Sequence, residues 1–223
     1  MELLGAGRDS DIFAHGPGTV LRRYRDGRSA AAEAEVVGRL HRLGYPVPAV
    51  RAVAGPDLVM ERIDGGTMTR SLLGGDLSPG TGGALLAALQ DRLHALPWPG
   101  DRPLLHLDLH PDNVLIGPGG PVVIDWANAR PGPVGVDAAL TALILAQVAM
   151  TPGTSPVSAE QVGPSRDGVI VTLRAFAAAV STPYASHLTD AEILRRRDPR
   201  LTTVELTHLA AAAVLARSAG PSP

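Results

Sequence analysis

The chain of 223 residues contains no cysteine and no lysine. Without cysteine, the protein can form no disulfide, no thiolate metal site and no cysteine nucleophile. Every basic residue is an arginine, whose guanidinium stays protonated, so mechanisms that need a Schiff base or a neutral lysine are also excluded. A phosphate-binding site in this chain must therefore use arginine side chains or backbone amides.

Aromatic residues and net charge are low as well. Aromatics make up 3% of the chain and the formal net charge is -2, so we expect no nucleic-acid partner. The first ten residues have no basic stretch followed by an apolar run, and the longest apolar stretch, 136–150, is too short to cross a bilayer. We therefore expect a cytoplasmic protein without a membrane partner. Hydrophobic residues are 45% of the chain, which is typical of a folded protein.

The first 65 residues read as short strands and one helix. Glycine and proline at 15–18 predict a turn of an antiparallel meander within 3–25, and the sequence predicts two further strands within 45–63. Ser29 is the expected N-cap of the intervening helix, and Gly44 is the expected residue after its end. The apolar stripe expected to be buried consists of Ala32, Val36, Val37, Leu40 and Leu43.

The rest of the chain is mainly helical in pattern. We place the boundary between two lobes after residue 63, where the pattern breaks at IDGG. A strand pair is expected on either side of a turn at 117–120, and residues 151–167, rich in proline, serine and glycine, are expected to form a loop. Expected helices cover residues from 82 to 96, 136–150, 168–180, 190–197 and 203–217.

The segment HLDLHPDN, residues 106–113, concentrates polar side chains before the strand pair, and Asp125 follows that pair in VVIDW. Phosphoryl transfer needs a carboxylate that orients or deprotonates the attacking hydroxyl, and oxygen ligands that hold Mg²⁺ against the phosphates. Asp108 supplies such a carboxylate, while Asn113 and Asp125 supply oxygen ligands. A second interpretation uses the alternation of His106, Asp108 and His110, which on a strand would face one side and could form the metal site of a hydrolase.

These motifs resemble the aminoglycoside phosphotransferase and choline-kinase-like family, small-molecule relatives of protein kinases. HLDLHPDNVL and VVIDW resemble its catalytic and metal-binding motif, GAGRDSDIF its nucleotide-covering loop, and TVLRR the strand with its phosphate-pairing base. AAAEAEVVGRL resembles the helix that carries the acidic partner of that base, DLVMERIDG the hinge between lobes, and PVGVDAA an aspartate-anchored helix. The resemblance implies an α+β, two-lobed protein-kinase-like fold, with a small antiparallel-sheet N-lobe (1–63) and a mostly helical C-lobe (64–223).

The resemblance also implies roles for individual residues. Asp108 matches the catalytic base, and Asn113 and Asp125 match the two Mg²⁺ ligands. The nucleotide-binding positions carried over are Ser10 in the covering loop, Val20 and Arg22 on the strand, Glu33 on the helix, and Met60, Glu61 and Ile63 in the hinge. A register shifted by one residue would put Leu21 and Arg23 in place of Val20 and Arg22.

The chain departs from the family pattern at two positions. Arg22 stands where a lysine is usual, and Leu107 replaces a glycine often found before the catalytic aspartate. The chain is also short for the family.

Each site residue also has a purely structural interpretation. Asp108 could cap a helix or turn, Asn113 could stabilise its own loop, and Asp125 could cap a strand end. Glu33 could be a solvated glutamate on an alanine-rich helix, and Ser10 an ordinary turn residue.

Together these expectations give a small-molecule phosphotransferase with an alcohol group as acceptor. It would move the γ-phosphoryl of ATP or GTP, with Mg²⁺, to an unidentified hydroxyl acceptor. The alternatives are a nucleotide-binding pseudokinase without activity and the metal-dependent hydrolase above.

Overall fold

The computed structural model describes residues 1–7, 9–150, 165–199 and 201–220. They form two compact units, each described separately below. One consists of Met1–Gly66 and Val114–Ala129, and the other of Thr67–Asn113 and Arg130–Pro223.

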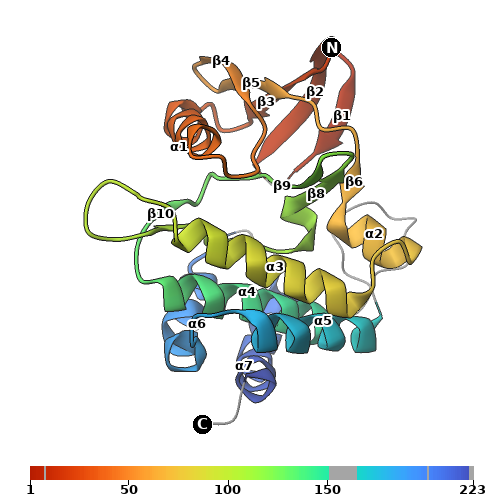
Figure 1. Ribbon diagram of the computed structural model, residues 1–223, viewed down its shortest axis with the longest axis vertical. Helices are drawn as coiled ribbons and strands as arrows, with labels where there is room; N and C mark the ends of the chain where they lie inside the picture. The colour runs from red at the N-terminus through yellow and green to blue at the C-terminus, as the bar shows by residue number, and fades with distance from the viewer. Residues whose placement is uncertain (8, 151–164, 200, 221–223) are drawn as a thin grey trace. The chain divides into compact units, whose positions relative to one another are not determined.

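The first unit is built on a five-stranded antiparallel sheet with the order β1-β2-β3-β5-β4 (Figure 1). Its strands are β1 (Leu3–Ala6), β2 (Ser10–Gly16), β3 (Thr19–Tyr24), β4 (Val50–Ala54) and β5 (Asp57–Glu61). Strands β1 to β3 form the expected meander. The β3–β5 register pairs Val20 with Met60 and Arg22 with Leu58. Alternation along β3 therefore gives Val20, Arg22 and Tyr24 one face of the sheet and Leu21 and Arg23 the other.

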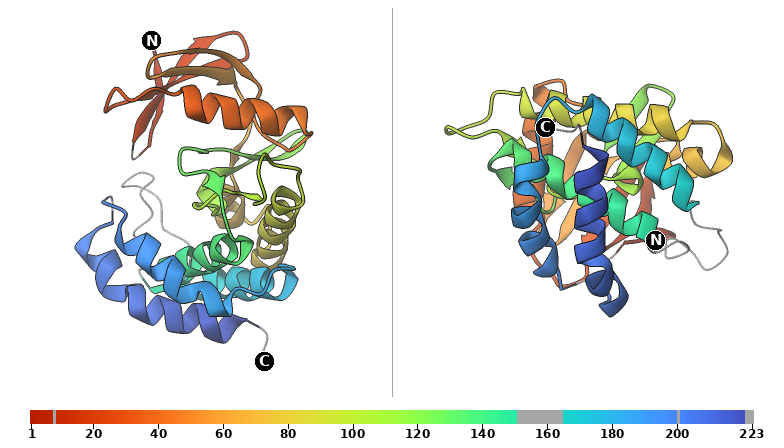
Figure 2. Two further views of the ribbon diagram at one scale, coloured as in Figure 1. Left: turned by 90° about the vertical axis from the view of Figure 1, so that its left-hand side faces the viewer. Right: turned by 90° about the horizontal axis from the view of Figure 1, so that it is seen from below.

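Helix α1 (Ala31–Arg42) joins β3 to β4 and contacts β4 (Figure 2). The predicted N-cap at Ser29 is wrong: Ala30 is the N-cap and has no side-chain cap, although the Ser29 hydroxyl accepts a hydrogen bond from the Ala31 N–H. The helix ends as expected, because Gly44 follows it with a left-handed φ of 74°.

The buried face of α1 also differs from the expected apolar stripe. Ala32 is exposed, and the buried residues are Glu33, Ala34, Val37 and Leu40. Glu33 is buried because it joins a polar network described below.

A hairpin completes the first unit. Strands β8 (Val114–Gly117) and β9 (Gly120–Val123) pair around the predicted turn, and β6 (Gly66–Thr67) lies beside β8. A Cβ atom on Gly65 would lie 2.1 Å from the carbonyl oxygen of Ile116, so only glycine allows this close approach. The Val123 N–H donates to the Pro46 carbonyl at 2.8 Å, which ties the hairpin to the segment after α1.

The second unit is a helical assembly in which α3 packs along α5, and α4 contacts α5, α6 and α7 (Figure 1 and Figure 2). A Cβ atom on Gly83 of α3 would lie 2.2 Å from the Thr172 carbonyl oxygen, so the two helices meet at a glycine. The helices are α2 (Met68–Gly74), α3 (Pro79–His94), α4 (Val134–Met150), α5 (Arg166–Ala179), α6 (Leu188–Arg196) and α7 (Thr203–Ala219). The shorter elements are the 3₁₀ turns Pro111–Asn113 and Ala185–His187 and the paired strands β7 (Leu104–Leu105) and β10 (Arg130–Pro131).

The five helices predicted for this part are present, and α2, with Thr67 as its N-cap, was not anticipated. Residues 151–164 of the predicted loop lie outside the described residues. The predicted loop is wrong at its end, because Arg166 already begins α5. Over the part of the chain that the structure describes, no helix has the length and apolar character needed to cross a membrane.

Candidate active site

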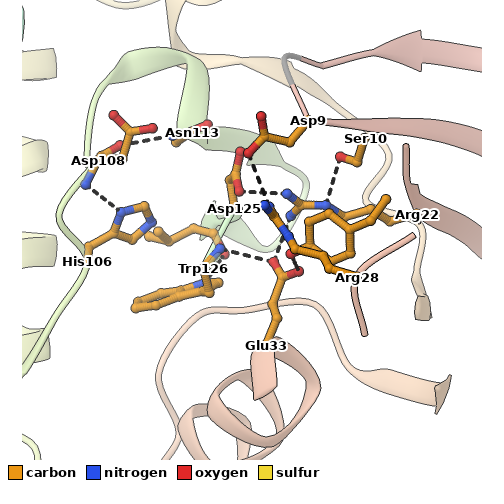
Figure 3. A network of polar contacts seen from close by, with 12 residues as sticks. Asp9, Ser10, Arg22, Arg28, Glu33, His106, Asp108, Asn113, Asp125 and Trp126 are labelled. Atoms are coloured by element: carbon orange, nitrogen blue, oxygen red, sulfur yellow. Dashed lines mark hydrogen bonds and ion pairs between the residues drawn. The ribbon is translucent and has the colours of Figure 1, made fainter. Parts of the chain in front are cut away.

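A buried guanidinium lies at the centre of a polar network in the first unit (Figure 3). Arg22 projects from β3, is 6% exposed and uses three nitrogens to reach three acceptors. Its Nε donates to the Ser10 hydroxyl at 2.9 Å, Nη1 to Glu33 Oε1 at 2.6 Å, and Nη2 to Asp125 Oδ1 at 2.7 Å. The structure therefore brings Ser10, Arg22, Glu33 and Asp125 together around one positive charge.

Glu33 is the second anchor of this network. Its Oε1 also accepts the Trp126 backbone N–H at 3.1 Å, and its Oε2 accepts a hydrogen bond from the Tyr24 hydroxyl. Glu33 is 5% exposed, so the alternative of a solvated glutamate is wrong. Through these hydrogen bonds Glu33 fixes both the Arg22 guanidinium on β3 and the Trp126 backbone that follows Asp125.

Opposing charges stabilise the buried guanidinium. Burial alone would disfavour the charge of Arg22, but Asp125 and Glu33 outweigh it and raise the pKa of the guanidinium above its ordinary value. Burial, together with the Glu33 carboxylate, raises the pKa of the Tyr24 hydroxyl, so Tyr24 stays a neutral donor. With one guanidinium against two carboxylates, the group of Arg22, Glu33 and Asp125 has a net negative charge. Such a group suits a cation.

Arg23 behaves differently from its neighbour. Its side chain is 43% exposed and forms a bidentate pair with Asp57, with contacts of 2.6 and 2.5 Å. The predicted contact between Arg22 and Glu33 is confirmed, and the register shifted by one residue is wrong.

The other expected nucleotide-binding residues of this unit lie around the same sheet. Val20 and Met60 are cross-strand partners on β3 and β5, and Met60 packs on the core cluster that contains Tyr24 and Leu58. The Glu61 N–H already donates to the Ala49 carbonyl at 2.9 Å, so this N–H is not available to a ligand. Ile63 follows β5 and approaches Gly117 of the hairpin.

The loop before Asp108, in the second unit, has an unusual backbone. Leu107 has a left-handed φ of 64°, a conformation that glycine adopts without strain and leucine does not. Asp137 at the start of α4 stabilises it: Oδ1 accepts the Leu107 N–H at 2.7 Å and Oδ2 accepts the His106 N–H at 3.1 Å. His94 Nε2 lies 2.9 Å from the same Oδ2.

Asp137 is fully buried, and its charge is held by these donors. Burial opposes ionisation, but the His94 contact and the Leu107 N–H keep the pKa of the Asp137 carboxyl below its ordinary value. A buried carboxylate thus fixes the backbone on which Asp108 stands.

Asp108 and Asn113 lie together in this loop (Figure 3). The Asn113 amide nitrogen donates to the Asp108 carbonyl at 2.9 Å, which orients the amide. The Asp108 N–H donates to His106 Nδ1 at 3.2 Å, and the Asp112 N–H donates to His110 Nδ1 at 3.3 Å. The two histidines therefore support the loop.

The hydrolase alternative finds no support in this geometry. His106 is fully buried, and its Nδ1 already accepts the Asp108 N–H. Within the described ranges, no three His, Asp or Glu side chains are grouped so that they could hold a metal ion. Asn113 offers an amide oxygen and Asp125 a carboxylate oxygen, and each is a kind of ligand that Mg²⁺ accepts.

Asp125 shares the unusual backbone of Leu107. Its φ is 63°, and among the described residues these two are the only non-glycine residues with a positive φ. Such conformations are unfavourable by about 1–3 kcal/mol and are concentrated at functional sites. The two backbone outliers lie at the predicted metal ligand and next to the predicted base.

Several supporting residues of the site were not predicted from the sequence. Neither Tyr24 nor His94 was assigned a role from the sequence, although each contacts a buried carboxylate of the candidate site. Asp137 was anticipated only as the aspartate of the anchored helix in PVGVDAA, and Gln147, which is 3% exposed in the apolar helix α4, was assigned no role. A polar residue within an apolar helix is the signal that could have identified both, because a buried polar group needs a partner.

The fold and this network define the class as a protein with a kinase-like fold. The chain matches the model of the phosphotransferase enzyme family over residues 1–105 and 84–164, and it belongs to that family. The family inferred from the sequence, and with it the enzyme class of a phosphotransferase, are thereby confirmed. A comparison with curated proteins finds no match.

Solved structures support the same fold class. The ADP-bound aminoglycoside phosphotransferase APH(2'')-Ib is 15% identical, with a TM-score of 0.56, over 97% of this chain and 93% of that one. An ethanolamine kinase from Plasmodium vivax is 11% identical, with a TM-score of 0.62, over 98% and 83%. A choline/ethanolamine kinase family protein from Mesorhizobium loti is 14% identical, with a TM-score of 0.60, over 98% and 91%. The predicted kinase-like α+β fold is confirmed.

Proposed function

We propose that this phosphotransferase moves the γ-phosphoryl of ATP or GTP to a hydroxyl of a small molecule, with Mg²⁺. The observation that carries the proposal is the buried Arg22, held between Glu33 and Asp125 and next to Ser10. A charged group is buried at considerable free-energy cost, and this one is fixed by residues from three separate segments. That arrangement suits a group that must meet phosphate oxygens at a defined position.

The first unit supplies the nucleotide-binding residues of the proposal. Val20 and Met60 pack against the purine base of the nucleotide. The Glu61 carbonyl and the Ile63 backbone form hydrogen bonds with the edge of that purine. The Ser10 hydroxyl and the Arg22 guanidinium contact the phosphates, with Glu33 keeping Arg22 in place. An arginine can do this because it is a bidentate donor that remains charged.

The second unit supplies the residues that act on the acceptor. Asp108 orients the acceptor hydroxyl and takes its proton as the phosphoryl group moves. Asp137 holds the backbone before Asp108 through the His106 and Leu107 N–H groups, so the loop would need little rearrangement during the reaction.

Asn113 and Asp125 are the proposed Mg²⁺ ligands. Bound Mg²⁺ would neutralise charge that develops on the phosphate oxygens. The Asn113 amide is oriented by its bond to the Asp108 carbonyl, and Asp125 is held by Arg22. Both ligands are therefore fixed by neighbours within their own unit.

The remaining parts of the proposal follow from the sequence. The N-lobe comprises residues 1–63 and the C-lobe residues 64–223. The protein is located in the cytoplasm. The acceptor is an unidentified small molecule with a hydroxyl group.

Nucleotide titration and an acceptor panel test the proposal. We expect Mg·ATP or Mg·GTP to raise the melting temperature, and at least one hydroxyl acceptor to stimulate ADP or GDP release. The panel contains choline, ethanolamine, gentamicin, sugars and hydroxyl amino acids. No Mg-dependent nucleotide effect at millimolar concentration would contradict the proposal, while nucleotide binding without turnover on any acceptor would favour a pseudokinase.

A further inference from the structure

A second guanidinium lies beside the proposed base. Arg195, near the end of α6, places its Nη1 3.8 Å from Asp108 Oδ1 and 3.5 Å from Asp198 Oδ2. The side chains of Arg195 and Asp108 are 11% and 18% exposed, so solvent screens this ion pair only in part. Neither the proposed mechanism nor the sequence motifs assign Arg195 a role.

Buried polar groups hold this guanidinium in place. Arg195 Nε donates to Gln147 Oε1 at 2.9 Å, and Gln147 Nε2 donates to the Glu205 carbonyl at 3.2 Å. Gln147 is 3% exposed in the otherwise apolar helix α4. Both ends of its amide are therefore bonded, and a chain of contacts runs from the first turn of α7 through α4 to Arg195.

His110 approaches Asp108 at the same oxygen. Its Nε2 lies 3.9 Å from Asp108 Oδ1, the atom that Arg195 also faces. The two side chains thus flank Oδ1 and leave Oδ2 as the oxygen that would take the proton of the attacking hydroxyl.

We propose that Arg195 is a positioning residue for Asp108, an inference that rests on the proposed function. Arg195 holds the carboxylate so that Oδ2 faces the acceptor hydroxyl, and it offsets the repulsion between this carboxylate and the anionic phosphoryl group. The bond from Gln147 fixes the guanidinium in advance, so no ordering is needed when the substrates bind.

The neighbouring Arg196 provides a matched control. It lies on the same helix, but its side chain is 49% exposed and pairs with Glu192 one turn away at 2.6 Å. Arg196→Gln removes the same charge from α6 without touching the Asp108 loop.

The experiment measures ADP release from Mg·ATP with water as the acceptor, and with the best member of the acceptor panel. We expect Arg195→Gln to lower kcat about tenfold or more, a fraction of what a positioned base contributes. The KM for Mg·ATP should stay within about twofold, because the residue acts on the acceptor side. Arg196→Gln should match wild type, and Arg195→Lys, which keeps the charge, should recover part of the loss.

A double-mutant cycle separates positioning from a merely structural role. If Arg195 acts through Asp108, adding Arg195→Gln to Asp108→Asn should change the residual ADP release by less than about twofold. Independent, additive losses would overturn the proposal, as would Arg195→Gln activity within about twofold of wild type. A wild-type chain that binds no Mg·ATP and releases no ADP would overturn the proposed function, and this inference with it.

Discussion

Replacement of Arg22 by alanine removes the centre of the polar network in the first unit. The Arg22 and Glu33 side chains are 7% and 4% exposed, so the substitution leaves Glu33 as a buried carboxylate without its cation. Breaking a buried ion pair in this way destabilises a protein by about 3–5 kcal/mol. Because the Tyr24 hydroxyl and the Trp126 N–H still bond Glu33, we expect the lower end, about 3 kcal/mol.

The matched control is Arg23→Ala on the same strand. Its pair with Asp57 involves side chains that are 43% and 26% exposed, and such pairs contribute about 0.2–1 kcal/mol. For a chain of this size, 1 kcal/mol corresponds to roughly 2–4 °C in melting temperature. Arg22→Ala should therefore lower the melting temperature by roughly 6–12 °C, and Arg23→Ala by no more than about 4 °C.

Nucleotide binding gives a second readout of the same substitutions. Each hydrogen bond from Arg22 to a phosphate oxygen is worth about 1.5–3 kcal/mol, so Arg22→Ala should weaken Mg·ATP binding at least about tenfold. Calorimetric titration below the melting temperature of the variant measures this, and Arg23→Ala should bind as wild type does. Equal melting temperatures and equal nucleotide affinities for the two variants would refute the assignment of Arg22.

Arg22→Lys examines the geometry of the site. The guanidinium reaches Ser10, Glu33 and Asp125 from three different nitrogens, whereas an ammonium must serve its partners from one atom. We expect intermediate stability, because the charge opposite Glu33 is kept and part of the fork is lost. Full activity of this variant would mean that lysine fits an ordinary kinase-like site, and complete loss would mean that the site is built around arginine.

Two further substitutions test the metal site and the loop support. Asp125→Ala should weaken Mg·ATP binding at least about tenfold, because it removes an anionic ligand of the cation, and it should weaken the binding of metal-free ATP less. Calorimetric titration with and without Mg²⁺ measures both affinities. Equal Mg·ATP affinity in the variant and the wild type would place the metal elsewhere. Asp137→Asn should destabilise the fold by about 3–5 kcal/mol, measured by urea unfolding, because the His94 contact and two backbone donors lose a buried carboxylate. Because the pKa of Asp137 is lowered in the folded state, its carboxylate stabilises the wild type at pH values above the ordinary pKa of 3.8. This stabilisation is lost as the pH falls below 3.8. The difference in unfolding free energy between wild type and Asp137→Asn should therefore shrink in acid.

Much of the fold could be predicted because its signals are local. The meander turn, the β8–β9 turn and the end of α1 each contain a glycine with positive φ, namely Gly18, Gly120 and Gly44. Glycine at such a place is a local signal that can be read from the sequence. The contact between Arg22 and Glu33 was implied by the family resemblance, and alternation along β3 added that only one of Arg22 and Arg23 can lie on the side of Glu33.

The rest depended on contacts between distant segments. The apolar pattern predicted that Ala32 lies on the buried face of α1. In the structure Glu33 lies there, because it bonds to the polar network, and Ala32 is exposed. The pair between Arg22 and Asp125 joins positions far apart in the sequence. Leu107 looked like a simple exchange for glycine, but its left-handed backbone depends on Asp137, which no local pattern connects to it.

The most direct test of the account is ADP release by wild type and Asp108→Asn across the acceptor panel, with Mg·ATP affinity measured on both. We predict that at least one hydroxyl acceptor stimulates the wild type. Asp108→Asn should bind Mg·ATP with similar affinity and release ADP at least about a hundredfold more slowly, because a positioned base contributes that much to proton transfer. Turnover of the variant within a few-fold of wild type would contradict the role of Asp108 and, with it, the proposed mechanism.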